Sequence, residues 1–156
     1  MEYAGPTIVV DADACPVKSE IAITARLFSV PVLLVASYDH RLQEEEGVRV
    51  VQVDRSSQSV DLYIANHIRR GDIVVTQDFG LATISLAKGA TVLSNRGQRY
   101  DDATIDFLME RRHEQAKIRR GGGRAKGPRA MSGEDRVRFQ QKLTKVLQMR
   151  QEIKEP

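Results

Sequence analysis

Five short apolar runs alternate with segments of helical spacing along most of this 156-residue chain, and this alternation limits the fold more than any other feature. Apolar runs of this length are typical of strands buried in a parallel sheet, and the segments between most of them can form crossover helices. Right-handed crossovers place helices on both faces of such a sheet. We therefore predict an α/β fold with three α/β/α layers, a mostly parallel five-stranded sheet in the order 3-2-1-4-5, and C-terminal helices.

The chain divides at a segment in which glycine and arginine dominate. We predict an α/β domain over residues 1–118, a basic, mobile Gly/Arg-rich linker over 119–131, and a C-terminal helix within 132–156 that packs on the same domain. Ser132 and Asp135 have the spacing of a capping box before that helix. The predicted strands are 7–10, 31–36, 48–53, 73–76 and 91–93, and the predicted helices are 16–28, 58–70, 79–88, 102–117 and 134–150.

Composition indicates an ordinary soluble protein, with 41% hydrophobic and 29% charged residues. No apolar run approaches the roughly 20 residues that cross a membrane, and the N-terminus lacks a signal-peptide pattern, so we expect a cytoplasmic protein without a membrane partner. The single cysteine excludes an internal disulfide, which fits a reducing compartment.

The net charge of +3 conceals an uneven distribution. Residues 1–95 contain 8 Lys/Arg and 12 Asp/Glu, whereas residues 96–156 contain 16 and 9. An acidic core followed by a basic tail suits a metal-binding site that acts on a polyanion, but a solvated basic tail has the same composition. Charge alone leaves both interpretations open.

Aspartates gather where the predicted strands end. Asp11 and Asp13 follow the first strand, and Asp78 follows the fourth. Asp61 belongs to the first turn of the helix after the third strand and continues the apolar stripe that includes Ile64. Because the strand order reverses between strands one and four, a crevice is expected there, and we predict that all four carboxylates surround it.

Several carboxylates in one crevice are costly unless they bind a cation or take up protons. Hard oxygen ligands without a supporting Cys or His set favour Mg²⁺ or Mn²⁺. We predict that Asp11, Asp61 and Asp78 bind the metal and that Asp13 supports them or orients water, which makes all four candidate catalytic residues for phosphodiester hydrolysis. Taken singly, each aspartate also suits a strand end or a helix cap.

Basic residues near the crevice and along the tail suggest that the partner is a nucleic acid, with RNA as the predicted substrate. With four Phe, four Tyr and no Trp, a base-stacking platform is not expected. The candidate phosphate-binding residues are Lys18, Arg96, Arg99, Arg119, Arg120, Arg124 and Lys126.

Three segments of the chain are distinctive: residues 11–18 (DADACPVK), 71–82 (GDIVVTQDFGLA) and 95–100 (NRGQRY). Together they resemble the YaiI/YqxD family of bacterial proteins. That family is grouped with PIN-like domains, whose members include ribonucleases that use Mg²⁺ or Mn²⁺ at an acidic site. The resemblance implies a PIN-like fold with Asp11, Asp61 and Asp78 at the positions of the acidic residues. The chain departs from the family at Gln58, where an aspartate is common, and this removes one charge near the site.

Two other functions fit parts of the pattern. Asp11 and Asp13 also match the start of haloacid-dehalogenase-like phosphatases, in which the first aspartate is the nucleophile and the second the general acid. That interpretation leaves Asp61 unexplained. A domain that binds nucleic acid without cleaving it is the non-enzymatic alternative. The sequence does not predict an oligomeric state.

Minor features have simpler explanations. We expect Cys15 to be a packed thiol, although it precedes a helix, where a thiolate would be stabilised. Asp72 is expected at the opposite edge of the sheet in a structural role, and Asp101 and Asp102 are expected to cap a helix.

Overall fold

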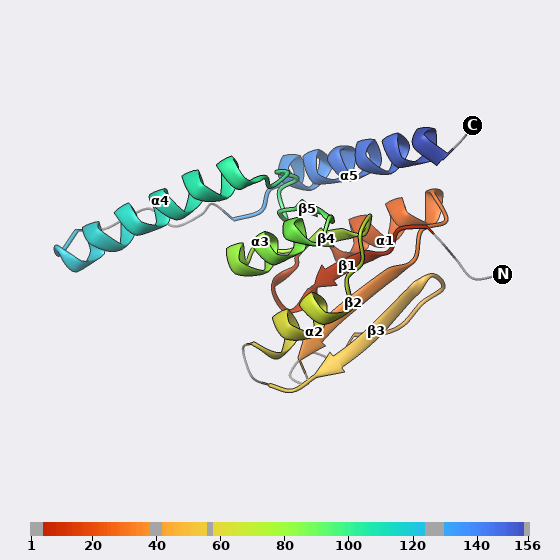
Figure 1. The fold of residues 1–156 in the computed structure, drawn as a ribbon, viewed down its shortest axis with the longest axis horizontal. Helices are drawn as coiled ribbons and strands as arrows, with labels where there is room; N and C mark the ends of the chain where they lie inside the picture. Colours follow the sequence, from red (N-terminus) through yellow and green to blue (C-terminus); the bar gives the residue numbers. More distant parts are fainter. Residues whose placement is uncertain (1–4, 38–41, 56–57, 124–129, 155–156) are drawn as a thin grey trace.

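The computed structural model describes residues 5–37, 42–55, 58–123 and 130–154, with the side chains described as far as residue 151. Five strands and five α-helices, with one short 3-10 turn, make up the described chain (Figure 1). In chain order these are β1 (Ile8–Asp11), η1 (Ala12–Ala14), α1 (Lys18–Leu27), β2 (Val32–Ser37), β3 (Val48–Val53), α2 (Ser59–His67), β4 (Ile73–Val75), α3 (Phe79–Ala87), β5 (Thr91–Leu93), α4 (Asp102–Arg120) and α5 (Gly133–Lys154).

The sheet has the order β3-β2-β1-β4-β5, and each neighbouring pair of strands is parallel. The predicted fold class and strand order are therefore confirmed. Val10 of β1 pairs with both Leu34 of β2 and Val75 of β4, so β1 lies at the centre of the sheet. The order reverses between β1 and β4, and the carboxyl ends of these two strands lie side by side.

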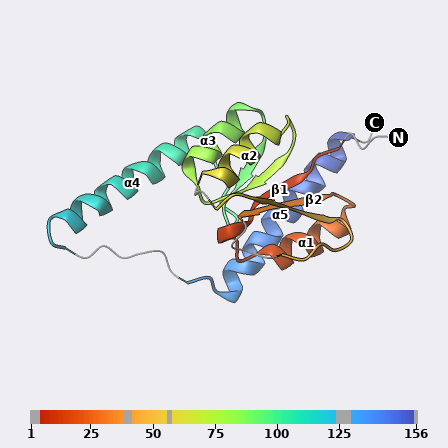
Figure 2. The same ribbon diagram turned by 90° about the horizontal axis from the view of Figure 1, so that it is seen from below.

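Two hydrophobic cores form because alternate residues of each strand face opposite sides of the sheet. Ile8 and Val10 of β1 pack in the core that α1 and α5 cover. Val9 packs in the other core, beneath α2 and α3. The two helical layers are visible on either side of the sheet in Figure 2. This arrangement is the predicted three-layer architecture.

The first connection differs from the predicted helix over 16–28. Residues 12–14 form the 3-10 turn η1, and α1 begins only at Lys18, with Val17 as its N-cap. Pro16 therefore precedes the helix instead of occupying its first turn. The 3-10 turn thus separates the end of β1 from the start of α1.

The next helix is also shorter than predicted. α2 starts after Gln58 and ends at His67, because Ile68 is already extended. Residues 56 and 57, which precede this helix, lie outside the described residues.

The two C-terminal helices are longer than predicted. α4 continues to Arg120, three residues past its predicted end, and projects away from the body in both ribbon views (Figures 1 and 2). α5 begins with the predicted capping box: Ser132 N donates to the Asp135 carboxylate, and Asp135 N donates to Ser132 Oγ. Phe139 and Leu143 of α5 are completely buried in the hydrophobic core between α1 and the sheet. The last helix is thus part of the domain.

Candidate functional site

A threonine joins the ends of the two central strands. Asp11 ends β1, and Thr76 follows β4, so the two residues are neighbours at the carboxyl edge of the sheet. Thr76 Oγ1 donates to Asp11 Oδ2 at 2.9 Å and accepts from the Asp78 backbone N–H at 3.0 Å. One buried hydroxyl therefore fixes Asp11 relative to the turn that carries Asp78.

Asp78 caps α3, as one of its two interpretations predicted. Its Oδ1 accepts from the Leu81 N–H at 2.8 Å. The cap leaves Asp78 exposed at the carboxyl edge of the sheet. Capping and membership of the acidic cluster are therefore compatible at this residue.

Asp61 approaches the same place from α2. It lies in the first turn of that helix and is partly buried, while Val60 and Ile64 anchor the helix in the core. The charges of Asp78 and Asp11 both act on the Asp61 carboxyl, which places the three side chains near one another. The structure thus brings Asp11, Asp61 and Asp78 together from three separate segments.

The electrostatics of this cluster follow from partial burial and like charge. Burial raises the pKa of Asp61 to about 6, aided by the charges of Asp78 and Asp11. Burial also raises the pKa of Asp11, and the charges of Asp13 and Asp78 add to this, whereas the hydrogen bond from Thr76 lowers it. Asp11 and Asp61 therefore both resist ionisation at this site.

Asp13 is near the cluster but has a structural partner. Its Oδ1 accepts from the Ser37 N–H at 2.9 Å, which ties η1 to the end of β2. Its charge still acts on Asp11. Asp13 thus contributes to the field of the site while it holds the turn that follows β1.

The loop after β5 is tied to the loops that carry Asp11 and Asp78. Asn95 is buried, donates its side-chain amide to the Ala14 carbonyl at 2.9 Å, and donates its backbone N–H to Gln77 Oε1 at 2.8 Å. These bonds connect the loops after β1, β4 and β5. Asn95 belongs to a segment that resembles the family, and its hydrogen bonds hold these loops in place.

Sequence reasoning missed Tyr100. This tyrosine is buried, its ring meets the edge of Phe79, and burial together with the charge of Asp78 raises its pKa to about 12. It therefore remains protonated beside the acidic cluster. Its place at the end of the quoted segment 95–100 was the only signal in the sequence.

The described residues contain no group of three or more His, Cys, Asp or Glu side chains arranged to hold a metal ion. Mg²⁺, however, is commonly held by one or two carboxylates, with waters and substrate phosphates as its other ligands. Asp61 and Asp78, with the charge of Asp11 near them, supply that donor chemistry. The residues therefore fit a hydrated divalent cation better than an ion enclosed by protein.

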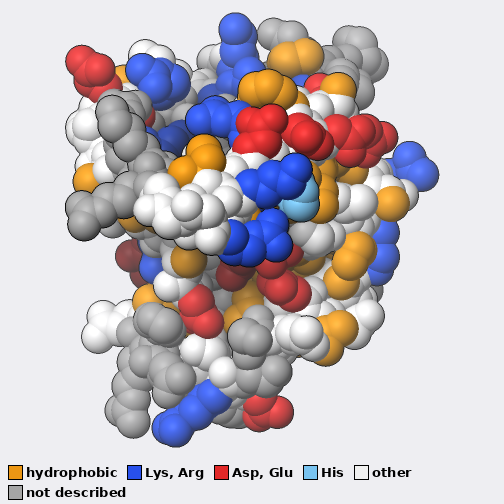
Figure 3. Space-filling model, turned by 90° about the vertical axis from the view of Figure 1, so that its left-hand side faces the viewer, with side chains coloured by type: hydrophobic (Ala, Val, Ile, Leu, Met, Phe, Trp, Pro, Cys, Tyr) orange, Lys and Arg blue, Asp and Glu red, His pale blue; other side chains and the backbone are white. Residues whose placement is uncertain are grey.

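The candidate phosphate-binding residues do not form one group. Lys18 Nζ donates to the Cys15 carbonyl at 2.8 Å, and Arg96 pairs with the buried Asp135 at 2.6 Å. Arg99 is exposed, and Arg119 and Arg120 lie at the far end of α4. Arg124 and Lys126 lie outside the described residues. Figure 3 shows basic and acidic side chains next to one another on the face from which α4 projects.

The simpler interpretations of the remaining residues hold. Cys15 is buried, and burial raises the pKa of its thiol, so its position before α1 does not activate it. Asp72 is buried and accepts from the Thr7 and Arg69 N–H groups. Asp101 caps α4 by accepting from the Thr104 N–H.

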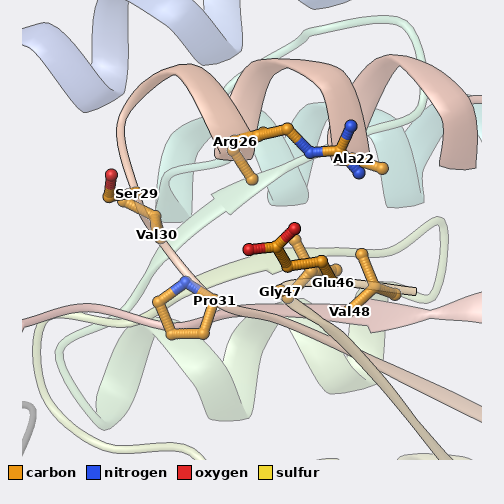
Figure 4. A pocket seen from close by; sticks show the side chains of 10 residues that line it. Ala22, Arg26, Ser29, Val30, Pro31, Glu46, Gly47 and Val48 are labelled. Carbon is orange, nitrogen blue, oxygen red and sulfur yellow. The ribbon is translucent and has the colours of Figure 1, made fainter. Parts of the chain in front are cut away.

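A cavity of about 430 Å³ lies elsewhere, between the end of α1 and the start of β2 and β3. Arg26 and Glu46 line it from opposite walls, and Pro31 forms part of its floor (Figure 4). These residues precede or begin strands, so the cavity is at the amino edge of the sheet. It is separate from the carboxylates and takes no part in the site.

Within the described part of the chain, no helix combines the length and apolar character needed to cross a membrane. The family described as "Uncharacterized BCR, YaiI/YqxD family" matches residues 9–149. The UPF0178 protein BH1374 of Halalkalibacterium halodurans is 49% identical over 143 residues, which cover 92% of this chain and 91% of the relative. The UPF0178 protein RBAM_023530 of Bacillus velezensis is 50% identical over 142 residues, which cover 90% and 84%. No solved structure matches the chain.

Proposed function

Since the chain belongs to the uncharacterised YaiI/YqxD family of bacterial proteins, its function has to be inferred from its own site, and we propose that it is a metal-dependent hydrolase of RNA phosphodiesters. The observation that carries this proposal is the convergence of Asp11, Asp61 and Asp78 at the carboxyl edge of the sheet, where the strand order reverses. Open α/β sheets bind their ligands at such a point. The resemblance to PIN-like ribonucleases points to the same three positions.

In this proposal Asp61 and Asp78 hold Mg²⁺ or Mn²⁺, and Asp11 completes the acidic set. The ion, when bound, neutralises the phosphate and lowers the pKa of a coordinated water. Thr76 keeps Asp11 turned toward the site, and the cap on α3 keeps Asp78 in place. Asp13 and Asn95 hold the surrounding loops, so that the carboxylates keep their positions when substrate arrives.

The proton balance of the cluster supports cation binding. Asp61 holds a proton up to about pH 6, because its burial and the neighbouring carboxylates oppose its ionisation. A divalent cation relieves the same repulsion more strongly than one proton does. Metal binding is therefore expected to release a proton below about pH 6 and to strengthen as the pH rises through that value.

The decisive experiment is isothermal titration of the full chain with Mn²⁺, followed by an RNA cleavage assay with and without the metal. The wild type is expected to bind Mn²⁺ and to cleave RNA, and Asp61→Asn and Asp78→Asn are expected to lose both activities. Asp101→Asn is the matched control, because it makes the same chemical change at an exposed helix cap outside the cluster. Absence of Mn²⁺ binding to the wild type, or equal binding to Asp61→Asn, would refute the site.

A second candidate is RNA binding without cleavage, favoured by the lack of a ready-made metal arrangement among the described residues and by Gln58 in place of a carboxylate. Binding that stays unchanged in Asp11→Asn, with no cleavage by the wild type, would identify this function. A phosphorylated Asp11, trapped with a phosphate-ester substrate, would instead identify the phosphatase alternative.

A further inference from the structure

Among the described residues, α4 has no packing partner over most of its length. Within this helix, whose residues are all described, Ile105 is the single buried residue. Arg112 still lies over the ring of Phe79 in α3. The C-terminal part of α4 extends beyond the body (Figures 1 and 2). Isolated helices shorter than about 12–15 residues are marginal in water. From the residues that the structure describes, the outer part of α4 therefore receives little of the packing that normally stabilises a helix.

One side of α4 carries two large apolar side chains in water. Phe107 is 61% exposed and Ile118 is 49% exposed. At about 100° per residue, Phe107, Arg111, Glu114 and Ile118 lie within a stripe about 60° wide. Its centre is about 150° around the helix from Ile105, which faces the body. We call these four residues the α4 stripe.

The α4 stripe is complementary to itself when the direction of the helix is reversed. In an antiparallel pair centred between Arg112 and His113, Phe107 lies opposite Ile118 of the second copy, and Arg111 lies opposite its Glu114. The same order holds in the other direction, which is the requirement for a two-fold interface. Two copies of the same helix can therefore form an apolar contact at each end of the stripe and two ion pairs between those contacts.

The overall charge of α4 favours the same arrangement. Its first turn contains Asp102, and its last turn contains Lys117, Arg119 and Arg120. Antiparallel pairing sets the acidic start of each helix beside the basic end of the other, and it also opposes the two helix dipoles. Parallel pairing would place like charges together.

We propose that the α4 stripe binds a second copy of this chain, forming an antiparallel α4–α4 dimer. A contact restricted to one helix buries less than the roughly 1,200 Å² of a stable interface, so the dimer is weak, with a Kd on the order of 10 µM. It is held partly by surface charge and weakens with added salt. This inference is independent of the proposed hydrolase activity, because it uses none of the clustered aspartates.

The test is sedimentation velocity of the full chain over a range of concentrations. The wild type is expected to pass from monomer to dimer, and Ile118→Glu is expected to weaken the dimer at least about tenfold, because it puts a charge against Phe107 of the second copy. Lys145→Glu, at an exposed position of α5, is the matched control and leaves dimerisation unchanged. Circular dichroism verifies that each variant is folded.

A mixing experiment identifies the pairing itself. Arg111→Glu places two acids in the α4 stripe, and Glu114→Arg places two bases there, so each variant alone repels its own copy. Mixed in equal amounts, the two variants are expected to form a heterodimer that restores both ion pairs. A wild type that stays monomeric, or a mixture that gives no heterodimer, overturns the proposal. If Arg111→Glu loses RNA binding but has the same oligomeric state as the wild type, the α4 stripe would be assigned to nucleic-acid binding instead.

Discussion

Replacing Asp61 with asparagine is expected to stabilise the metal-free protein. The carboxyl has a pKa of about 6 in the fold and an ordinary value of 3.8, so ionisation above pH 6 opposes folding. A shift of this size corresponds to about 3 kcal/mol for a fully enclosed group. Asp61 is partly exposed, and solvent screening reduces the expected gain in unfolding free energy to about 1 kcal/mol. In a chain of this length that is about 2–4 °C in Tm.

The sign of the effect depends on pH. Because the folded-state pKa is raised, the stability that Asp61 contributes is fully present below pH 3.8 and is lost as the pH rises through about 6. Asp61→Asn does not titrate, so its advantage over the wild type grows through this window and is constant above it. Urea unfolding in EDTA, measured at several pH values on both sides of the window, gives the difference directly.

Asp101→Asn is the control for this measurement. The pKa of Asp101 is lowered because its carboxylate accepts from the Thr104 backbone, so its contribution is lost only as the pH falls below 3.8. Across the window of Asp61 its variant should follow the wild type. An Asp61→Asn protein that is no more stable than the wild type above pH 6, or whose advantage is independent of pH, would refute the repulsion within the cluster.

Three further predictions concern the rest of the fold. Asp135→Ala should lower the unfolding free energy by about 3–5 kcal/mol in urea denaturation, because it removes the buried carboxylate that pairs with Arg96. A loss below about 1 kcal/mol would contradict this prediction. Gly97→Ala should cost more than Gly47→Ala: both have positive φ, but only at residue 97 would the new Cβ meet backbone, 3.0 Å from Phe139 Cα. Equal losses would exclude that close approach. Cys15 should react with a thiol reagent at the rate of global unfolding, and rapid labelling of the folded protein would show that the thiol is accessible.

The order of the sheet was predictable because the physical signals were local and repeated. Each apolar run between polar turns specifies a strand, and the handedness of the crossovers limits the topology. Asp11 and Asp78 followed from this, since the carboxyl ends of β1 and β4 must be neighbours. Predicting Asp61 required one more inference, namely that it shares the apolar stripe of α2 and therefore faces the sheet.

The unpredicted parts depend on contacts between residues far apart in sequence. Nothing local to Thr76 indicates that its hydroxyl joins Asp11 to the turn of Asp78, 65 residues from its acceptor. Arg96 was predicted to bind phosphate, and only the folded chain reveals that the buried Asp135, from α5, is its partner. The 3-10 turn before α1 depends likewise on Asp13 reaching the end of β2.

The position of α5 has a consequence for how this protein is made. Asn95 holds the loop of the first aspartates, and the adjacent Arg96 is held by Asp135 of the last helix. Phe139 and Leu143 of that helix also complete the core beneath β1. A nascent chain thus cannot complete the surroundings of its aspartates until α5 has left the ribosome. Products that terminate before α5 would expose an apolar face to proteases and chaperones, so only chains that include this helix would acquire a formed site.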